Sequence, residues 1–349
     1  MYCQNLVFPK PDSLLGRRIL SIDGGGILGM FPISFLAEIE QYLDNPIGKY
    51  FDLIAGTSTG GILAIALALG IPATVLLRLY EKKGPDIFGQ SHRGIGRIPM
   101  KMIRRVRHLY RHKYDSDELR DALTEVLGNQ RLGEAQTRLI IPSWSPVAQS
   151  VYIYKTAHHE RLRTDYKELA LDVALATSAA PTYFRQYITA TGTGLIDGGV
   201  WANNPIALAV TEAIGLLKWS PAELHVLSLS CLQEVYTIPK WAGIGTLGLK
   251  AINLFMDGQS HGAMGMAKIL TGDGHERQAI HRIDHKVPRG KFRMDDTGQI
   301  PDLKGLGHTK ARESFPLLQS IFFTCPAETF IPVYPLDPMT ELEAPHEAN

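Results

Sequence analysis

Cysteine is scarce in this sequence. Cys3, Cys231 and Cys325 are spread along 349 residues. Such an odd, scattered set does not build the disulfide framework of a small secreted protein and is typical of a reducing compartment. The first twenty residues also lack an apolar segment between a basic start and a cleavage site, so we expect no secretory signal. Together these absences favour a cytoplasmic protein.

A long apolar run is also missing. The most apolar window, residues 60–77, is interrupted by Gly70 and Pro72. About ten residues precede the break, whereas a membrane-spanning helix needs about twenty. The window therefore predicts a buried helix and not a membrane span.

Neither sign of charge is in excess. The 36 Lys and Arg against 35 Asp and Glu give a formal net charge of +1, which argues against a nucleic-acid polymer as a partner. Positive charge is concentrated in residues 92–113, where eight Arg or Lys, including Arg104, Arg105 and Arg107, occur without an acid. We interpret this segment as a solvated face, a site for anionic lipid headgroups, or a site for a phosphorylated regulator.

Apolar residues make up 45% of the chain and charged residues 20%, as in a globular protein with a large core. Residues 17–22 and 50–56 are short apolar strands, each followed by a glycine-containing loop and a helical pattern, at 31–44 and 59–70. Two consecutive strand–loop–helix units predict an α/β fold with a mostly parallel central sheet flanked by helices on both faces. Further strands are expected at 138–141, 150–155, 193–197, 223–230 and 279–284, and further helices at 72–83, 115–127, 167–178, 204–218 and 308–320.

The pattern divides the chain into three parts. Residues 1–16 form an N-terminal segment, residues 17–235 the core with the basic insertion at 90–113, and residues 236–349 a C-terminal portion packed on the core as a lid or regulatory unit. In this portion, residues 241–270 combine glycine, methionine and large apolar side chains. We predict either a core helix or the adaptable wall of a lipid channel there, because methionine packs against ligands of different shape.

A Gly-x-Ser-x-Gly motif joins the second predicted strand to its helix. Gly56 and Gly60 flank Ser58 two residues away on either side. In this strand–turn–helix setting the motif predicts a nucleophile elbow, whose crowded backbone requires small residues at both glycine positions. The serine then lies at a helix N-terminus, where amide groups stabilise developing negative charge. The alternative is a Gly-Ser turn that caps a buried helix.

A second glycine-rich turn, at residues 23–29, ends the neighbouring strand. Gly24, Gly25 and Gly26 can expose their amides without side-chain obstruction. We therefore consider them candidates for an oxyanion hole, to which Thr59 adds the N–H that follows the nucleophile.

The same turn permits another interpretation. Gly24, Gly26 and Gly29 satisfy the G-x-G-x-x-G fingerprint of dinucleotide sites, with Asp44 as the ribose ligand. We disfavour it, because Asp44 lies at the end of a helix and not of a strand. The fingerprint also leaves the serine motif unexplained.

Activation of a serine requires a base. Asp197 ends a predicted strand before Gly198 and Gly199, which allow an abrupt turn, and it is our candidate base. Its alternative role is to support the turn or cap the next helix. If all three glycine-rich turns lie at the carboxyl ends of parallel strands, they bring together amides, a hydroxyl and a carboxylate for acyl transfer by a Ser/Asp dyad. Histidines in a permissible order for a Ser-His-Asp triad are His225, His275, His281 and His285.

At these motifs the sequence resembles the patatin-like phospholipase family. The resemblance covers about residues 17–215. It rests on the DGGG loop, the GTSTG elbow, the segment ALATSAAPTYF at 174–184 and the segment DGGVWANNP at 197–205.

The resemblance implies a serine lipid acyl hydrolase of the phospholipase A type that acts on membrane phospholipids. Ser58 is then the nucleophile, Asp197 the base, and Gly24 to Gly26 the oxyanion hole. No metal or organic cofactor is implied. One position departs from the family pattern D-G-G-G-x-R-G, since Leu28 stands where a basic residue is usual. Two alternatives are therefore kept, a Ser-His-Asp esterase and a catalytically weak protein that binds lipid or nucleotide.

The chain is also similar to bacterial patatin-like effectors of antiviral (CBASS) defence, which cyclic di- or trinucleotides switch on. This similarity implies an activating cyclic nucleotide and a homo-oligomer on activation. It further implies a cytoplasmic protein that associates peripherally with the inner face of the membrane.

Overall fold

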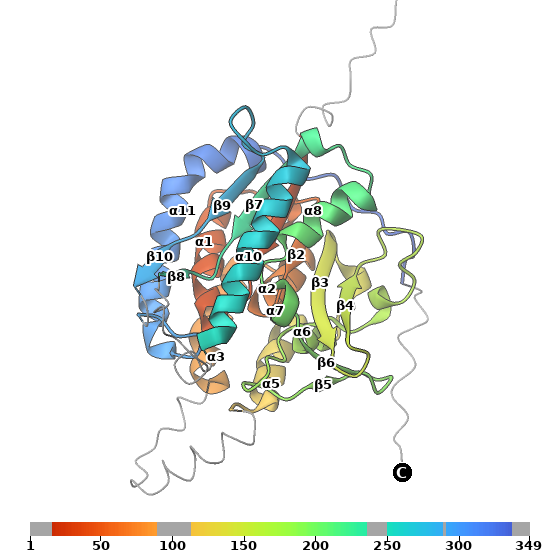
Figure 1. Cartoon of the computed structure of the whole chain (residues 1–349), viewed down its shortest axis with the longest axis vertical. Helices are drawn as coiled ribbons and strands as arrows, with labels where there is room; N and C mark the ends of the chain where they lie inside the picture. The colour runs from red at the N-terminus through yellow and green to blue at the C-terminus, as the bar shows by residue number, and fades with distance from the viewer. Residues whose placement is uncertain (1–15, 89–112, 236–249, 289–290, 337–349) are drawn as a thin grey trace, which may run out of the picture.

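In the computed structural model of the chain, residues 16–88, 113–235, 250–288 and 291–336 are described (Figure 1). The predictions for the N-terminal segment and for Arg104, Arg105 and Arg107 of the basic segment lie outside the described residues.

Eight strands of the described residues form one central sheet in the order β5-β6-β3-β2-β1-β7-β9, with β4 paired to β3. Their bounds are β1 Arg17–Ile22, β2 Leu53–Gly56, β3 Arg138–Ser145, β4 Ser150–Lys155, β5 Tyr187–Ile188, β6 Gly194–Asp197, β7 Leu224–Leu229 and β9 Ile280–Ile283. The neighbours β3, β2, β1, β7 and β9 run parallel. This confirms the mostly parallel sheet predicted from the sequence.

The strand that ends at Asp197 runs against the expected direction. β6 pairs antiparallel with β3, so that Ser143 lies opposite Asp197. The sequence predicts that Asp197 ends a parallel strand, and this is wrong. The pairing uses the part of β3 that extends past its parallel contact with β2, which ends at Ile140. Asp197 therefore reaches the site edge of the sheet from an antiparallel strand.

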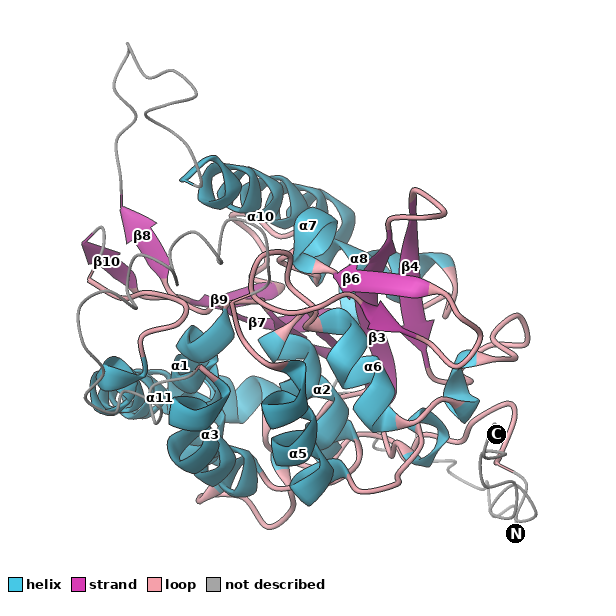
Figure 2. Cartoon of the chain, turned by 90° about the horizontal axis from the view of Figure 1, so that it is seen from below, coloured by secondary structure: helices cyan, strands magenta, loops and turns pink. Residues whose placement is uncertain are grey.

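Helices cover both faces of the sheet (Figure 2). One face carries α1 Met30–Glu40, α2 Thr59–Ala68, α3 Ala73–Ile87, α5 Ser116–Leu127, α6 Ala170–Thr177 and α11 Ile300–Phe322. The other carries α7 Gly199–Ala202, α8 Ile206–Gly215 and α10 Lys250–Thr271. Successive strand residues point to opposite faces, so β1 places Leu20 and Ile22 in the first core and Ile19 in the second.

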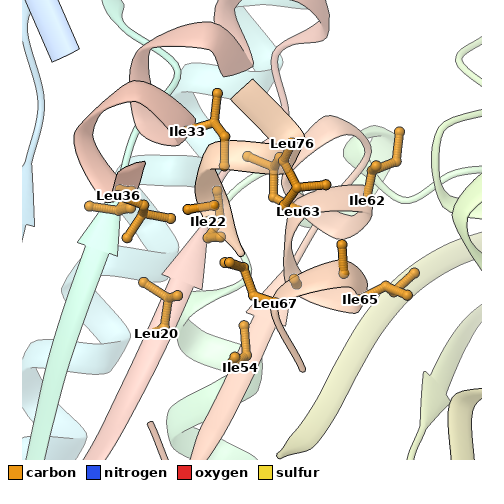
Figure 3. Close-up of a cluster of buried hydrophobic side chains, with 14 of the residues drawn as sticks. Leu20, Ile22, Ile33, Leu36, Ile54, Ile62, Leu63, Ile65, Leu67 and Leu76 are labelled. Carbon is orange, nitrogen blue, oxygen red and sulfur yellow. The ribbon is translucent and has the colours of Figure 1, made fainter. Parts of the chain in front are cut away.

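The helix that follows the serine motif is buried on all sides. All ten residues of α2 are buried, which is the expected environment of a helix that is apolar all round. Leu63 and Leu67 belong to one core cluster with Ile22 and Ile54 of the strands and Leu76 of α3 (Figure 3). The N-terminus of α2 is therefore fixed firmly beside the end of β2.

Smaller elements complete the described chain. A second sheet pairs β8 Gln233–Val235 with β10 Lys286–Pro288. Short 3-10 helices lie at Gly26–Gly29, Ile47–Tyr50, Leu132–Glu134, Asp165–Lys167, Pro221–Glu223 and Thr297–Gln299. No helix in these parts of the chain combines the length and apolarity needed to cross a bilayer.

Several predicted boundaries differ from the structure, and those of β2 and α11 are examples. β2 begins at Leu53 and not at residue 50, because residues Ile47–Tyr50 form a 3-10 turn. α11 begins at Ile300, eight residues before its predicted start at 308. The helix passes through Gly307, where a Cβ would lie 2.5 Å from the carbonyl oxygen of Phe31, so glycine allows α1 and α11 to approach closely.

Candidate active site

Ser58 lies on a strained turn between β2 and α2. Its backbone has φ 56° and ψ −124°, a conformation that a residue with a Cβ rarely adopts. The turn is crowded: a Cβ on Gly56 would lie 2.0 Å from the carbonyl oxygen of Gly60, and one on Gly60 would lie 2.4 Å from that of Ile22. This is the tight strand-to-helix geometry in which a serine hydroxyl is presented at the end of a sheet.

Two threonines hold this turn in place. The Ser58 amide donates to Thr177 Oγ1 at 3.1 Å, and the Thr177 hydroxyl donates to the carbonyl of Pro142 at 2.7 Å. The Thr57 hydroxyl donates to the carbonyl of Ala202 at 2.6 Å. These bonds fix the turn to β3 and to the segment that follows Asp197. Thr177 lies in the segment ALATSAAPTYF, but its bond with Ser58 could not be predicted from the motif.

Asp197 is brought directly to Ser58. Its side chain accepts a hydrogen bond from the Gly199 amide at 2.6 Å, and the Ser58 hydroxyl lies close enough to favour the ionised carboxylate. The residue is only 4% exposed. Burial raises the pKa of Asp197 from 3.8 to about 6, and the Ser58 hydroxyl and the Gly199 amide oppose this shift without cancelling it. The carboxylate is therefore a stronger base than an exposed aspartate and is still ionised near neutral pH.

Two of the three glycines predicted for the oxyanion hole, Gly25 and Gly26, line the same cavity as Ser58. The sequence also predicts an oxyanion-hole amide from Gly24, but the Gly24 N–H donates to the carbonyl of Asn203 at 3.0 Å. Gly24 therefore secures the loop instead of offering a donor to a ligand. Sequence spacing alone does not show this, because Asn203 is distant along the chain.

Thr59 is the first residue of α2 and also lines the cavity. The first amides of a helix have no acceptor within the helix, so the Thr59 N–H is suited to an anionic ligand. Its side chain has a separate role, since the hydroxyl donates to the carbonyl of Gly26 at 2.9 Å.

The C-terminal portion supports the glycine loop from behind. Arg282 of β9 makes two hydrogen bonds to the carboxylate of Asp23, at 3.0 and 2.5 Å, and one to the Ser228 hydroxyl at 2.7 Å. The Ile27 amide donates to the carbonyl of Met294 at 2.9 Å. The first and last parts of the loop are thus anchored by residues more than 200 positions away.

A largely apolar cavity of about 420 Å³ opens beside Ser58 and Asp197. Its size lies within the range of about 300–1,000 Å³ that is typical of small-molecule sites. Phe255 of α10 and Val200 of α7 line it while being 72% and 50% exposed, and so mark its mouth. Its other apolar lining comes from Ile62, Leu79, Tyr80, Ile87, Phe88, Leu119, Ala122, Leu123, Phe184, Met256 and Met294.

The structure also locates the residues of the alternative interpretations. Among the residues that the structure describes, no histidine lines this cavity. His225 and His281 belong to β7 and β9, and the His281 ring packs edge-on against Phe322 at 5.5 Å. His275 and His285 also lie outside the lining. Asp44, the proposed ribose ligand, borders a different groove, formed with the end of α11. Among the described residues, no group of three or more His, Cys, Asp or Glu side chains is placed to hold a metal ion.

Comparison with known proteins agrees with this geometry. The sequence profile of the patatin-like phospholipase family matches residues 20–210. The chain belongs to this family.

Several family members are similar over larger or smaller parts of the chain. A cGAMP-activated phospholipase of Vibrio cholerae is 30% identical over 344 residues, covering 90% of this chain and 96% of the relative. A cGAMP-activated phospholipase of Pseudomonas aeruginosa is 37% identical over 188 residues, or 54% of each chain. Patatin-like protein 1 of Oryza sativa is 36% identical and covers 59% of this chain and 54% of its own. Among solved structures, VipD from Legionella pneumophila matches with a TM-score of 0.44 and 11% identity, over 87% of this chain and 67% of VipD.

The residue at which this patatin-like chain departs from the expected family pattern is buried. Leu28, which replaces the usual basic residue, is 7% exposed and packs in the core on the α2 side of the sheet. Among the described residues, Arg282 is a basic side chain that contacts the loop, through Asp23.

A first prediction concerns how the buried, ionised Asp197 carboxylate lowers the stability of the fold. Because its pKa is higher in the fold than in the unfolded chain, the folded state binds the proton more tightly, and ionisation destabilises the fold as pH rises from about 4 to about 6. We expect Asp197→Asn to raise the free energy of unfolding at pH 8 by up to about 3 kcal/mol. At pH 4 the gain should vanish. Thermal unfolding at the two pH values measures this, and equal changes at both would contradict it.

A second prediction concerns the anchor of the loop. Arg282→Met leaves the buried Asp23 carboxylate unpaired and should lower the free energy of unfolding by about 3–5 kcal/mol. Adding Asp23→Asn to this variant removes the unpaired charge and should recover part of the loss. Denaturant titration of the two variants measures both effects. If the double variant is no more stable than Arg282→Met, the pair does not act as described.

Proposed function

We propose that this patatin-like phospholipase hydrolyses fatty-acyl esters of membrane phospholipids through a dyad of Ser58 and Asp197. The observation that carries the proposal is the approach of the Ser58 hydroxyl to the buried Asp197 carboxylate at the wall of a largely apolar cavity. A hydroxyl, a buried base and an acyl-sized apolar space are the components that ester hydrolysis of a lipid requires. The family membership supports the same activity.

The proposed reaction has two halves. Asp197 accepts the hydroxyl proton as Ser58 Oγ attacks the ester carbonyl carbon, and the carbonyl oxygen becomes an oxyanion. The amides of Gly25, Gly26 and Thr59 are suited to bind that oxygen. When the intermediate collapses, the C–O bond to the lysolipid breaks and the alkoxide takes the proton from Asp197. Water then attacks the acyl-serine with the same base, which releases the fatty acid and restores Ser58.

The raised pKa of Asp197 suits this role. A general base is most effective when its pKa lies near the working pH, and about 6 is closer to neutrality than the ordinary 3.8. The turn strain at Ser58 and the burial of Asp197 both favour a preformed site. The Ser-His-Asp alternative finds no histidine at the cavity within the described parts of the chain, so the aspartate is the base that the geometry favours.

We further propose that a cyclic dinucleotide of the cGAMP type activates the enzyme in antiviral defence at the inner face of the membrane. The relative from Vibrio cholerae, which aligns with 90% of the chain, carries the name cGAMP-activated phospholipase. We also propose that residues 236–349 act as the regulatory portion. Arg282, Met294 and Gln259 of this portion bond to the catalytic loops, and so connect it to the site.

The experiment that tests the function measures fatty acid released from vesicles of phosphatidylethanolamine and phosphatidylglycerol, with and without cGAMP. Wild type with cGAMP should release fatty acid, with a rate that rises with pH and levels off above about pH 6 as Asp197 ionises. Ser58→Ala should abolish release, and Asp197→Ala should lower it by about 10²–10⁴-fold. Cyclic di-AMP and cyclic di-GMP serve as comparison ligands, and light scattering on the same samples reports assembly.

The outcomes separate the two proposals. If Ser58→Ala releases fatty acid as fast as wild type and a fluorophosphonate does not label Ser58, the hydrolase proposal fails. If Ser58-dependent hydrolysis is present but no cyclic nucleotide binds or stimulates it, only the activation proposal fails.

A further prediction concerns the acyl chain. Ala122 of α5 lines the cavity and is 1% exposed. Ala122→Leu should fill part of the cavity and lower kcat/KM for long-chain esters by about tenfold, the equivalent of roughly two methylene groups no longer buried. Short-chain esters should be hardly affected. Thr124→Leu, on the exposed side of the same helix, is the control, and an equal loss for short and long chains would contradict the assignment.

A further inference from the structure

The side chain of the residue that follows the nucleophile holds the glycine loop. The Thr59 hydroxyl donates to the carbonyl of Gly26 at 2.9 Å. A threonine hydroxyl has one proton, so this bond uses the whole donor capacity of the Thr59 side chain.

The bond to Gly26 completes the fixation of one peptide unit. The carbonyl of the Gly26–Ile27 peptide accepts from Thr59, and its N–H donates to the carbonyl of Met294 at 2.9 Å. A peptide group is planar, so bonds at both ends define its orientation. Gly26 itself has φ +58°, where glycine has no steric preference that could hold the loop without such bonds.

The neighbouring peptide before the loop is fixed as well. The N–H of Gly24 donates to the carbonyl of Asn203 at 3.0 Å. The two amides between these anchors belong to Gly25 and Gly26, which line the cavity. Their direction therefore depends on the anchored peptide on either side. Three hydrogen bonds anchor these peptides, and the bond from the Thr59 hydroxyl comes from the residue next to the nucleophile.

We propose that Thr59 is a positioning residue whose side chain holds the Gly25 and Gly26 amides toward the ester oxygen. The proposal rests on the hydrolase function proposed above. It gives Thr59 two separate tasks, since its N–H is suited to the oxyanion while its hydroxyl orients the other donors.

The test uses substitutions that remove only a hydroxyl. Thr59→Val should lower kcat on a soluble short-chain ester by about 10²-fold with KM unchanged, as expected when donors are displaced by about 1 Å. Thr59→Ser keeps the hydroxyl and should recover most of the rate lost in Thr59→Val. The rate of phosphonylation of Ser58 by a fluorophosphonate should fall in the same order, because that reagent also places an oxygen in the hole.

Matched controls lose an equivalent bond elsewhere. Thr137→Val removes a buried hydroxyl that donates to the carbonyl of Gly48 at 3.2 Å, and Tyr152→Phe removes one that donates to Asp165 at 3.3 Å. Neither residue lines the cavity, and both variants should keep the wild-type kcat. Thermal unfolding of all variants shows whether a loss of rate follows a loss of folded protein.

Each outcome decides the proposal. If wild type shows Ser58-dependent hydrolysis and Thr59→Val is as active as Thr137→Val, the positioning role is wrong and the hydrolase function stands. If Thr59→Ser is as slow as Thr59→Val, the hydroxyl is not the cause and the proposal also fails. If wild type is no faster than Ser58→Ala, the hydrolase function itself fails, and the positioning role with it.

Discussion

The conformation of Ser58 is the constraint on which the site depends. A serine at φ 56° has a backbone energy penalty on the order of 1–3 kcal/mol, so the surrounding structure must enforce it. The burial of α2 provides this enforcement. Leu63 and Leu67 are 0% and 1% exposed, and burial of each contributes about 1.5–3 kcal/mol. The burial of two such side chains already offsets the strain. The hydrogen bonds of Thr57 and Thr177 fix the orientation of the turn.

The carboxylate that faces this serine is a second source of lost stability. Burial of Asp197 raises its pKa, which means that the fold is less stable with the ionised form that the proposed chemistry requires. The Gly199 amide and the Ser58 hydroxyl reduce this cost without removing it. The strained turn and the buried acid lie in contact, and the apolar cores on both faces of the sheet supply the stability that keeps both in place. Backbone strain and a buried charge are expected to occur together where a site is preformed.

The features that could be predicted from the sequence are those determined by short segments of the chain. The strands at 17–22 and 150–155 have the bounds expected from their apolar runs, and the meeting of Ser58 with Asp197 follows from motifs at strand ends. The features that could not be predicted join distant segments. The antiparallel direction of β6 and the occupation of the Gly24 amide by Asn203 depend on how strands assemble. No local sequence pattern predicts that Arg282 bonds to Asp23, because the two residues meet only when β1, β7 and β9 have assembled into the sheet.

The distant contacts bear on how a ligand can control this site. The family profile ends at residue 210, yet the glycine loop is anchored by Arg282 and Met294 beyond it. A ligand shifts a conformational equilibrium only by its difference in affinity for the two states. A regulator bound to the C-terminal portion therefore need not approach Ser58. It needs only to prefer the arrangement in which the Ile27 amide meets Met294, because that bond and the one from Thr59 together orient the loop. Any loosening of β9 or of the Met294 segment should act first on the direction of the amides, and only later on the Ser58–Asp197 contact, which is held by β2, α2 and β6.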